Sequence, residues 1–272
     1  MNTATLSRRG VTALGIGMLG VVLSAQTAAP PKPFEPTVGQ PGKDVVWVPT
    51  ADTLVAKMLD MAKVTPQDFV IDLGSGDGRT VIAAAKRGAG AMGIEYDPDM
   101  VELSRKNAVA AGVGEKTTFV KADIFETDFS KATVLTLFLL PDLNVRLRPT
   151  ILDMKPGTRV VSNSFTMGDW EPEDTATVQE DCTSWCKAFL WIVPAKVQGT
   201  WRTARGDLTV TQQCQIITGT LGTTPISGGR LRGTEITFTA GETTYIGQVN
   251  GSSMQGTASP GGSWSATKRD IP

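Results

Sequence analysis

Apolar and polar residues alternate along residues 45–195 in blocks that predict strands and helices in turn. Short apolar runs bounded by turn residues indicate buried strands, whereas apolar positions repeating every three or four residues indicate helices. The expected strands span residues 68–73, 91–95, 117–121, 132–138, 158–163, about 175–180 and 187–193. The expected helices span residues 51–63, about 79–87, 98–111 and 142–154. This alternation predicts an α/β domain with a doubly wound, mainly parallel sheet.

The last two of these strands are joined through residues 181–186 without a helix, so we expect an antiparallel hairpin at the end of the sheet. Residues 196–272 differ, with 13 glycines, many threonines and no helical period. Three glycines recur every 14 residues between short alternating strands: Gly219, Gly233 and Gly247. We therefore expect a small all-β domain, either a meander or a closed barrel, with Trp201 and Trp264 filling its interior.

The N-terminus has the pattern of an export signal over residues 1–28. Arg8 and Arg9 precede an apolar run over residues 11–23, which is too short for a membrane span. The paired arginines favour the twin-arginine route, so we expect a periplasmic protein with no stable membrane span after signal removal. An uncleaved N-terminus that anchors the protein is the alternative. Residues 29–44 are rich in proline and predict a flexible linker.

Composition excludes several kinds of chemistry. Lys and Arg together number 26 against 27 Asp and Glu, which argues against a nucleic-acid partner. The chain has no histidine, which excludes Ser-His-Asp and Cys-His catalysis and histidine-based metal sites, and we expect no metal. Cys182 and Cys186 could form a disulfide in an oxidising compartment and leave Cys214 alone. We expect these cysteines to be structural, either bridged or buried.

The candidate site begins where the strand over residues 69–73 ends. Asp72 is followed by Gly74-Ser75-Gly76-Asp77-Gly78 and then by a helix. Glycines let the backbone turn sharply and let a ligand approach peptide N–H groups. One residue, not two, separates the second and third glycines, which disfavours a dinucleotide-dependent redox enzyme. Asp72 would repel a pyrophosphate but suits a cationic ligand.

This loop resembles the glycine loop of class I S-adenosylmethionine-dependent methyltransferases, which implies a Rossmann-like seven-stranded sheet and S-adenosyl-L-methionine as cofactor. Residues 45–193 further resemble the branch that contains the mitochondrial lysine methyltransferases of the ATP synthase c-subunit and the adenine nucleotide translocase. The blocks that carry this resemblance are Val48-Pro49-Thr50, Asp72–Arg79, Val81–Lys86, Gly93–Pro98, Leu140-Pro141 and Arg159–Ser162 with Phe165 and Trp170. It implies methyl transfer to an amine, on a protein lysine or on a small molecule.

The expected cofactor-binding residues lie mostly where strands end. Glu95 would accept hydrogen bonds from the ribose hydroxyls. The resemblance places Asp123 and Ile124 at the adenine and Thr50 near the methionine end. The full set is Thr50, Asp72, Gly74, Ser75, Gly76, Gly78, Glu95, Asp123 and Ile124. Thr50 and Asp97 are also expected to cap the helices that follow them.

The fourth strand is expected to end at the methyl acceptor. Enzymes that methylate nucleobase amines carry Asn/Asp-Pro-Pro-aromatic there, and its absence from residues 139–144 also argues against a nucleic-acid substrate. Asp142 and Asn144 are the catalytic candidates that could orient the nucleophile, although both could instead cap the next helix.

Three aromatic residues are candidates for the apolar walls of an amine pocket or, alternatively, for plain core: Trp47, Phe165 and Trp170. The alternative function is an exported, non-catalytic binding protein that keeps the fold and binds a partner through its C-terminal module.

Overall fold

The computed structural model describes residues 1–6, 10 and 34–269. Most of the predicted signal (1–28) and the first part of the predicted linker lie outside the described residues. From residue 34 onward the chain forms one compact unit. Among the helices of the described residues, none combines the length and apolar character that crossing a bilayer requires.

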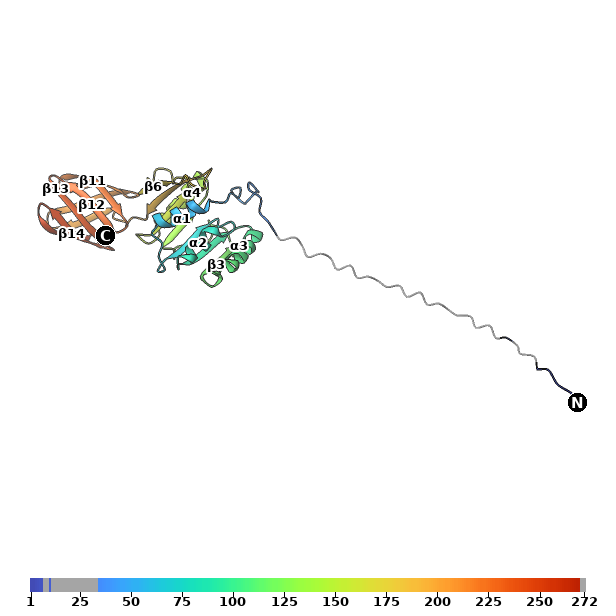
Figure 1. The fold of residues 1–272 in the computed structure, drawn as a ribbon. Helices are drawn as coiled ribbons and strands as arrows, with labels where there is room; N and C mark the ends of the chain where they lie inside the picture. Colours follow the sequence, from blue (N-terminus) through green and yellow to red (C-terminus); the bar gives the residue numbers. More distant parts are fainter. Residues whose placement is uncertain (7–9, 11–33, 270–272) are drawn as a thin grey trace. The chain divides into compact units, whose positions relative to one another are not determined.

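A seven-stranded sheet with the order β3-β2-β1-β4-β5-β7-β6 forms the first domain (Figure 1). Its strands are β1 (Phe69–Leu73), β2 (Gly90–Glu95), β3 (Thr117–Lys121), β4 (Val134–Leu137), β5 (Arg159–Asn163), β6 (Asp174–Thr177) and β7 (Lys187–Ile192). The first five are parallel, β7 is antiparallel to β5, and β6 is antiparallel to β7. The predicted doubly wound sheet and its terminal hairpin are confirmed. The strand order reverses between β1 and β4, where such sheets bind ligands.

Helices cover both faces of the sheet because its central strands are apolar on both sides. The helices are α1 (Asp52–Met61), α2 (Arg79–Lys86), α3 (Pro98–Ala110) and α4 (Pro141–Leu152), with a 3₁₀ turn, η1 (Gly114–Lys116). Helices α1, α2 and α3 pack in one apolar cluster with Val70 and Val134. Helix α4 packs in another with Ile71 and Leu135. Adjacent residues of one strand, such as Val70 and Ile71, therefore pack in two separate cores on opposite faces of the sheet.

The two predicted helix caps have different outcomes. Asp97 caps α3, since its carboxylate accepts a hydrogen bond of 2.9 Å from the Asp99 N–H. Thr50 does not cap α1, because Ala51 occupies the N-cap position. The Thr50 hydroxyl instead accepts a hydrogen bond of 3.2 Å from the side-chain amide of Asn163, at the end of β5. The predicted cap at Thr50 is therefore wrong.

The C-terminal strands form a closed eight-stranded barrel with the order β10-β11-β12-β13-β14-β15-β8-β9. They are β8 (Gly199–Thr203), β9 (Gly206–Gln213), β10 (Ile216–Leu221), β11 (Thr224–Arg232), β12 (Glu235–Ala240), β13 (Thr243–Asn250), β14 (Ser253–Ser259) and β15 (Gly262–Lys268). Figure 1 shows β11 to β14, in orange, running beside one another. The meander closes because β15 pairs with β8. The barrel, rather than the open meander, is confirmed.

Both predicted tryptophans contribute to the barrel interior. Trp201 is fully buried and donates a hydrogen bond of 2.7 Å to the Val197 carbonyl. Trp264 is partly buried, with its ring edge-on to Phe238 and Tyr245 at centroid distances of 5.7 and 5.6 Å. Indole rings with a satisfied N–H suit such a small interior.

We predict that the barrel depends on Gly219. A Cβ at Gly219 would lie 1.8 Å from the Thr209 carbonyl oxygen, whereas a Cβ at Gly228, also at positive φ, meets open space. Gly219→Ala should therefore destabilise the barrel by at least about 2 kcal/mol, and Gly228→Ala by about 1 kcal/mol. Scanning calorimetry of both variants measures the difference, and equal losses would contradict this explanation.

Candidate functional site

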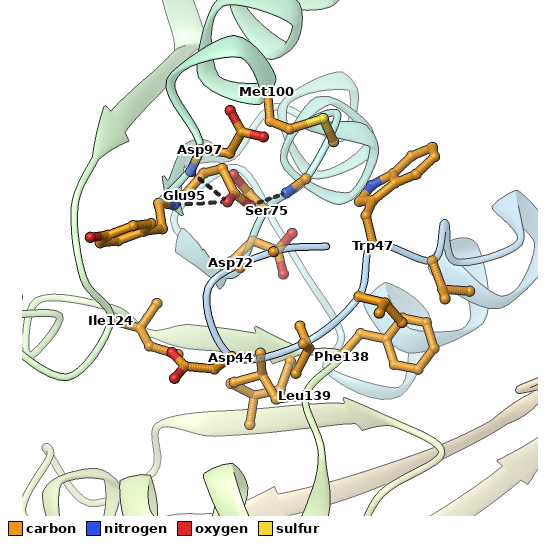
Figure 2. A pocket seen from close by; sticks show the side chains of 18 of the residues that line it. Asp44, Trp47, Asp72, Ser75, Glu95, Asp97, Met100, Ile124, Phe138 and Leu139 are labelled. Atoms are coloured by element: carbon orange, nitrogen blue, oxygen red, sulfur yellow. Dashed lines mark hydrogen bonds between the residues drawn. The ribbon is translucent and has the colours of Figure 1, made fainter. Parts of the chain in front are cut away.

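A cavity of about 540 Å³ lies where β1, β2 and β4 end. Its volume falls in the range of cofactor and small-molecule sites. Figure 2 shows its lining side chains converging from these strand ends. Eight of the nine predicted cofactor-binding residues line it: Thr50, Asp72, Gly74, Ser75, Gly76, Glu95, Asp123 and Ile124. Gly78 does not: it is the N-cap of α2, and a Cβ there would meet the side chains of Phe119 and Ser104.

The glycine loop presents fewer free N–H groups than the sequence suggests. The N–H groups of Gly74 and Ser75 donate to the Ile94 carbonyl at 2.9 and 3.1 Å. The Gly76 N–H donates to the Glu95 carboxylate at 2.8 Å. These amides are therefore engaged within the protein, and the expectation that they face the ligand is not met. Gly76 instead allows the close approach of the Trp47 ring, and Gly74 that of the Leu139 side chain.

Glu95 is held rigidly at the end of β2. Its carboxylate accepts hydrogen bonds from the backbone N–H groups of Gly76 at 2.8 Å, Tyr96 at 2.8 Å and Asp97 at 3.0 Å (Figure 2). A carboxylate has about four acceptor positions, so lone pairs remain for a ligand. Because three donors fix its orientation, Glu95 can accept hydrogen bonds from a pair of ribose hydroxyls.

Asp72 is the buried charge of the site. Its carboxylate accepts a hydrogen bond of 2.6 Å from the Thr136 hydroxyl. Burial raises the pKa of Asp72 to about 7, and repulsion by Glu95 and Asp77 adds to the effect. Figure 2 shows Asp72 at the centre of the cavity, with Glu95 on one side and Trp47 on the other. A carboxylate in this position is stabilised by a bound cation.

Thr50, which also lines the cavity, is held in place by Arg79. The Arg79 guanidinium donates to the Thr50 carbonyl at 2.9 Å and pairs with the Asp77 carboxylate at 2.6 Å. That pairing raises the pKa of Arg79. The start of α2 thereby holds the end of the N-terminal segment against the cavity, although Thr50 and Arg79 are far apart in sequence.

Residues 40–50 form a strap along the cavity, and part of this strap belongs to the predicted linker. A Cβ at Gly76 would lie 2.7 Å from the Trp47 Nε1 atom, so only glycine fits beneath that ring. Lys43 forms an ion pair with Asp123, which holds the pKa of this carboxyl below its usual range. An adenine amino group that binds Asp123 must therefore share it with Lys43 or displace Lys43.

The two catalytic candidates lie outside the cavity lining. Asp142 is exposed in the first turn of α4, where a negative charge favours the helix dipole. Asn144 is fully buried, and its amide lies 3.3 Å from the carbonyl oxygens of Phe165 and Thr166. Asn144 thus ties α4 to the segment after β5. A catalytic role for either residue stays a prediction that this geometry does not support.

Three aromatic side chains from three segments form one wall of the cavity, which we call the aromatic wall: Phe138, Phe165 and Trp185. Ring centroids lie 5.2 Å apart for Phe165 and Trp185, and 6.2 Å apart for Phe138 and Phe165. Phe138 follows β4, where the sequence predicts the methyl acceptor, and Phe165 follows the neighbouring strand β5. The wall provides apolar faces beside a cavity rich in carboxylates.

The sequence identified this wall only in part. Phe165 and Trp47 line the cavity. Trp170 is 1% exposed and packs against Trp191, so of its two expected roles the structure shows plain core. The sequence analysis does not identify Phe138 or Trp185 as wall residues. The position of Trp185 between two cysteines is the sequence signal that could have identified it.

The open question of the cysteines is answered by the structure. Cys182 and Cys186 form a disulfide with a Cα–Cα distance of 5.8 Å. Cys214 is a free, partly buried thiol whose pKa is raised by burial. The bridged pair closes the loop that contains Trp185 between β6 and β7.

The chain is similar to several known proteins. A profile of the ANTKMT methyltransferase domain matches residues 72–174. A protein-lysine N-methyltransferase of Saccharolobus islandicus (strain REY15A) is 41% identical over 139 residues, 50% of this chain and 86% of that protein. The ATP synthase C-subunit lysine N-methyltransferase of Xenopus laevis is 34% identical over 47% of this chain and 56% of that protein. An RNA methyltransferase from Salinibacter ruber, solved with S-adenosyl-L-homocysteine, is 46% identical, with a TM-score of 0.52. The match covers 55% of this chain and 96% of that protein.

These matches confirm the methyltransferase fold and S-adenosyl-L-methionine as the cofactor. The chain spans most of the Saccharolobus and Salinibacter proteins but about half of the Xenopus protein. The cavity suits this cofactor, since it offers Asp72 to a cation, Glu95 to a pair of hydroxyls and the apolar Ile124 to a ring. The profile ends before β8, so it does not include the barrel.

The raised pKa of Asp72 makes cofactor binding pH-dependent. Only the ionised carboxylate attracts a cation, and with a pKa of about 7 its ionised fraction rises from about a tenth at pH 6 to about nine tenths at pH 8. The affinity for S-adenosylmethionine should therefore increase roughly tenfold over this range. At the lower pH, binding should release the proton of the Asp72 carboxyl.

Titration calorimetry at several pH values measures this change. Asp72→Asn should bind more weakly and lose the dependence, which separates Asp72 from the titration of the ligand's own amino group. The same pH profile in both proteins would contradict the assignment.

Proposed function

The chain belongs to the family of S-adenosylmethionine-dependent methyltransferases that carry the ANTKMT domain, and we propose that its acceptor is the side-chain amine of a protein lysine. The names of the Saccharolobus and Xenopus relatives support this acceptor. The observation that carries the proposal is the aromatic wall of Phe138, Phe165 and Trp185 in an acidic cavity. Such a wall suits an aliphatic stem that ends in an amine.

The charge of the catalytic domain also supports a lysine acceptor. Residues 45–195 contain 15 Lys and Arg against 21 Asp and Glu, a net charge of −6. Residues 196–272 contain 7 Lys and Arg against 4 Asp and Glu, a net charge of +3. A negative domain attracts a cationic lysine and repels the phosphates of RNA. We therefore propose lysine despite the name of the Salinibacter relative.

When bound, S-adenosylmethionine supplies an electrophilic methyl group. Asp72 would hold the positive charge of the bound cofactor, and Glu95 would fix its ribose. These two contacts position the methyl group, and alignment of the nucleophile with the leaving group provides most of the rate enhancement. Both residues therefore act by placement.

The acceptor amine must first lose its proton. From a pKa near 10.4 this costs about 4–5 kcal/mol at neutral pH. Burial of the amine against apolar faces would lower its pKa and recover part of this cost, whereas the carboxylates of the cavity favour the ammonium form during the approach. The chain contains no histidine, so we propose that the amine gives its proton to solvent water before it reaches the cofactor.

Methyl transfer from labelled S-adenosylmethionine tests this function. The full chain should label lysine residues of peptides or proteins and leave RNA unlabelled. Gly76→Arg should abolish labelling, because a side chain at Gly76 meets the Trp47 ring beside the cofactor loop. Gly112→Arg is the matched control, since Gly112 also has positive φ but faces open space.

Each other outcome has a distinct meaning. Labelling of RNA alone would replace lysine as the acceptor. Cofactor binding without transfer to any lysine-containing protein or to RNA would favour the non-catalytic binding role, which the family matches do not favour.

We also propose that the chain is exported, as its N-terminal sequence indicates. The Cys182–Cys186 disulfide supports an oxidising compartment, since such bonds rarely persist in the cytosol. The cofactor is made in the cytoplasm, and the twin-arginine route would carry the folded enzyme with cofactor already bound.

Mass spectrometry of the protein purified from its host tests export. The mature chain should begin near residue 29, and alkylation without reductant should label Cys214 but neither bridged cysteine. An intact N-terminus with three labelled thiols would exclude export.

A further inference from the structure

We propose that Trp185 selects the methyl acceptor and that the Cys182–Cys186 disulfide holds it in position. This inference rests on the proposed lysine methyltransferase function and extends it to the residue that recognises the acceptor. The argument depends on where Trp185 lies, what holds it there and what its ring contacts.

Trp185 is a large apolar side chain that is not anchored by burial. It is 49% exposed, yet it lines the cavity. Its ring tilts against those of Phe165 and Phe138 at centroid distances of 5.2 and 6.3 Å. Trp185 therefore forms the outer part of the aromatic wall, and an acceptor passes it before reaching the buried centre at Asp72.

The backbone of Trp185 is in an unfavourable conformation. Its φ is +59°, in the left-handed region, and Asp181 in the same loop has a φ of +51°. Each such residue costs about 1–2 kcal/mol unless it is glycine, so the surrounding structure must impose the conformation. Without that restraint, Trp185 would return to negative φ and its ring would leave the wall.

The disulfide provides this restraint. It encloses the three residues 183–185, and Cys186 directly precedes β7. The Val178 N–H donates to the Cys186 carbonyl at 2.9 Å, which fixes that end of the loop to the hairpin. The Thr53 hydroxyl donates to the Glu180 carbonyl at 3.1 Å, which ties the loop to α1. Cys182–Cys186 is thus a positioning element for Trp185.

The geometry separates acceptor binding from cofactor binding. The cofactor-binding residues Asp72 and Glu95 lie at the ends of β1 and β2, whereas the ring contacts of Trp185 are to residues that follow β4 and β5. Loss of the Trp185 ring should therefore weaken the acceptor and leave the cofactor unaffected. An unbranched alkylamine fits the ring faces, through its apolar stem and through cation–π attraction when charged.

Kinetics with a lysine peptide test the proposal in the full chain. Trp185→Ala should raise KM for the peptide by about tenfold, with a smaller change in kcat, and Trp185→Phe should recover part of the loss. Cys182→Ser with Cys186→Ser should raise KM in the same direction. All variants should keep the wild-type affinity for S-adenosylmethionine in calorimetry, which also shows that they are folded.

Ile246→Ala is the matched control, since Ile246 is 50% exposed on β13 and lies outside the cavity lining. It should change neither quantity. An unchanged KM for Trp185→Ala would overturn the proposal, and an unchanged KM for the double cysteine variant would overturn the role of the disulfide.

A second measurement separates this inference from the proposed function. Calorimetry of n-butylamine, a probe of the lysine side chain, uses the protein saturated with S-adenosylhomocysteine and requires no turnover. The wild type should bind it about tenfold more tightly than Trp185→Ala and the double cysteine variant. If the wild type methylates no lysine, the proposed function fails, and equal butylamine binding by all three proteins would overturn the inference itself.

Discussion

A carboxylate buried at the end of the central strand is the constraint around which this site is built. Asp72 has one short hydrogen bond, from Thr136, and its acidic neighbours Glu95 and Asp77 oppose its ionisation. Its pKa of about 7 is the consequence. The ionised form of Asp72 is therefore disfavoured in the free protein, and we propose that a cationic cofactor supplies its partner.

The surrounding residues keep that charge available. Arg79 pairs with Asp77 and holds the Thr50 carbonyl, whereas Lys43 pairs with Asp123 at a separate position. Glu95 is held by three backbone donors. Each of these groups has a nearby partner within the protein, which leaves Asp72 as the charge that gains most from the ligand.

In the proposed function, different kinds of structure recognise the cofactor and the acceptor. The candidate cofactor residues are carboxylates and glycines that line the cavity at strand ends, which the sheet itself positions. The aromatic wall takes its rings from three segments, and the outermost, Trp185, belongs to a loop closed by a disulfide. The acceptor side can thus vary through one loop while the cofactor side remains fixed. The barrel has its own core and the opposite net charge, and the profile match does not reach it.

The sequence by itself determined the elements and most of the cofactor site, because both are local. The apolar strand before Gly74 and the spacing of Gly74, Gly76 and Gly78 follow from a few consecutive residues. Glu95 could be placed because strands of a parallel sheet end at the same edge. Only the tertiary structure decided what depends on contacts between distant segments. The Thr50 hydroxyl accepts a hydrogen bond from Asn163 instead of capping a helix. The Asn144 side-chain amide donates a hydrogen bond to the Phe165 carbonyl, after β5. Trp170 lies in the core and Trp185 in the aromatic wall. The sequence could not distinguish these roles, because the surroundings of a tryptophan side chain depend on distant segments.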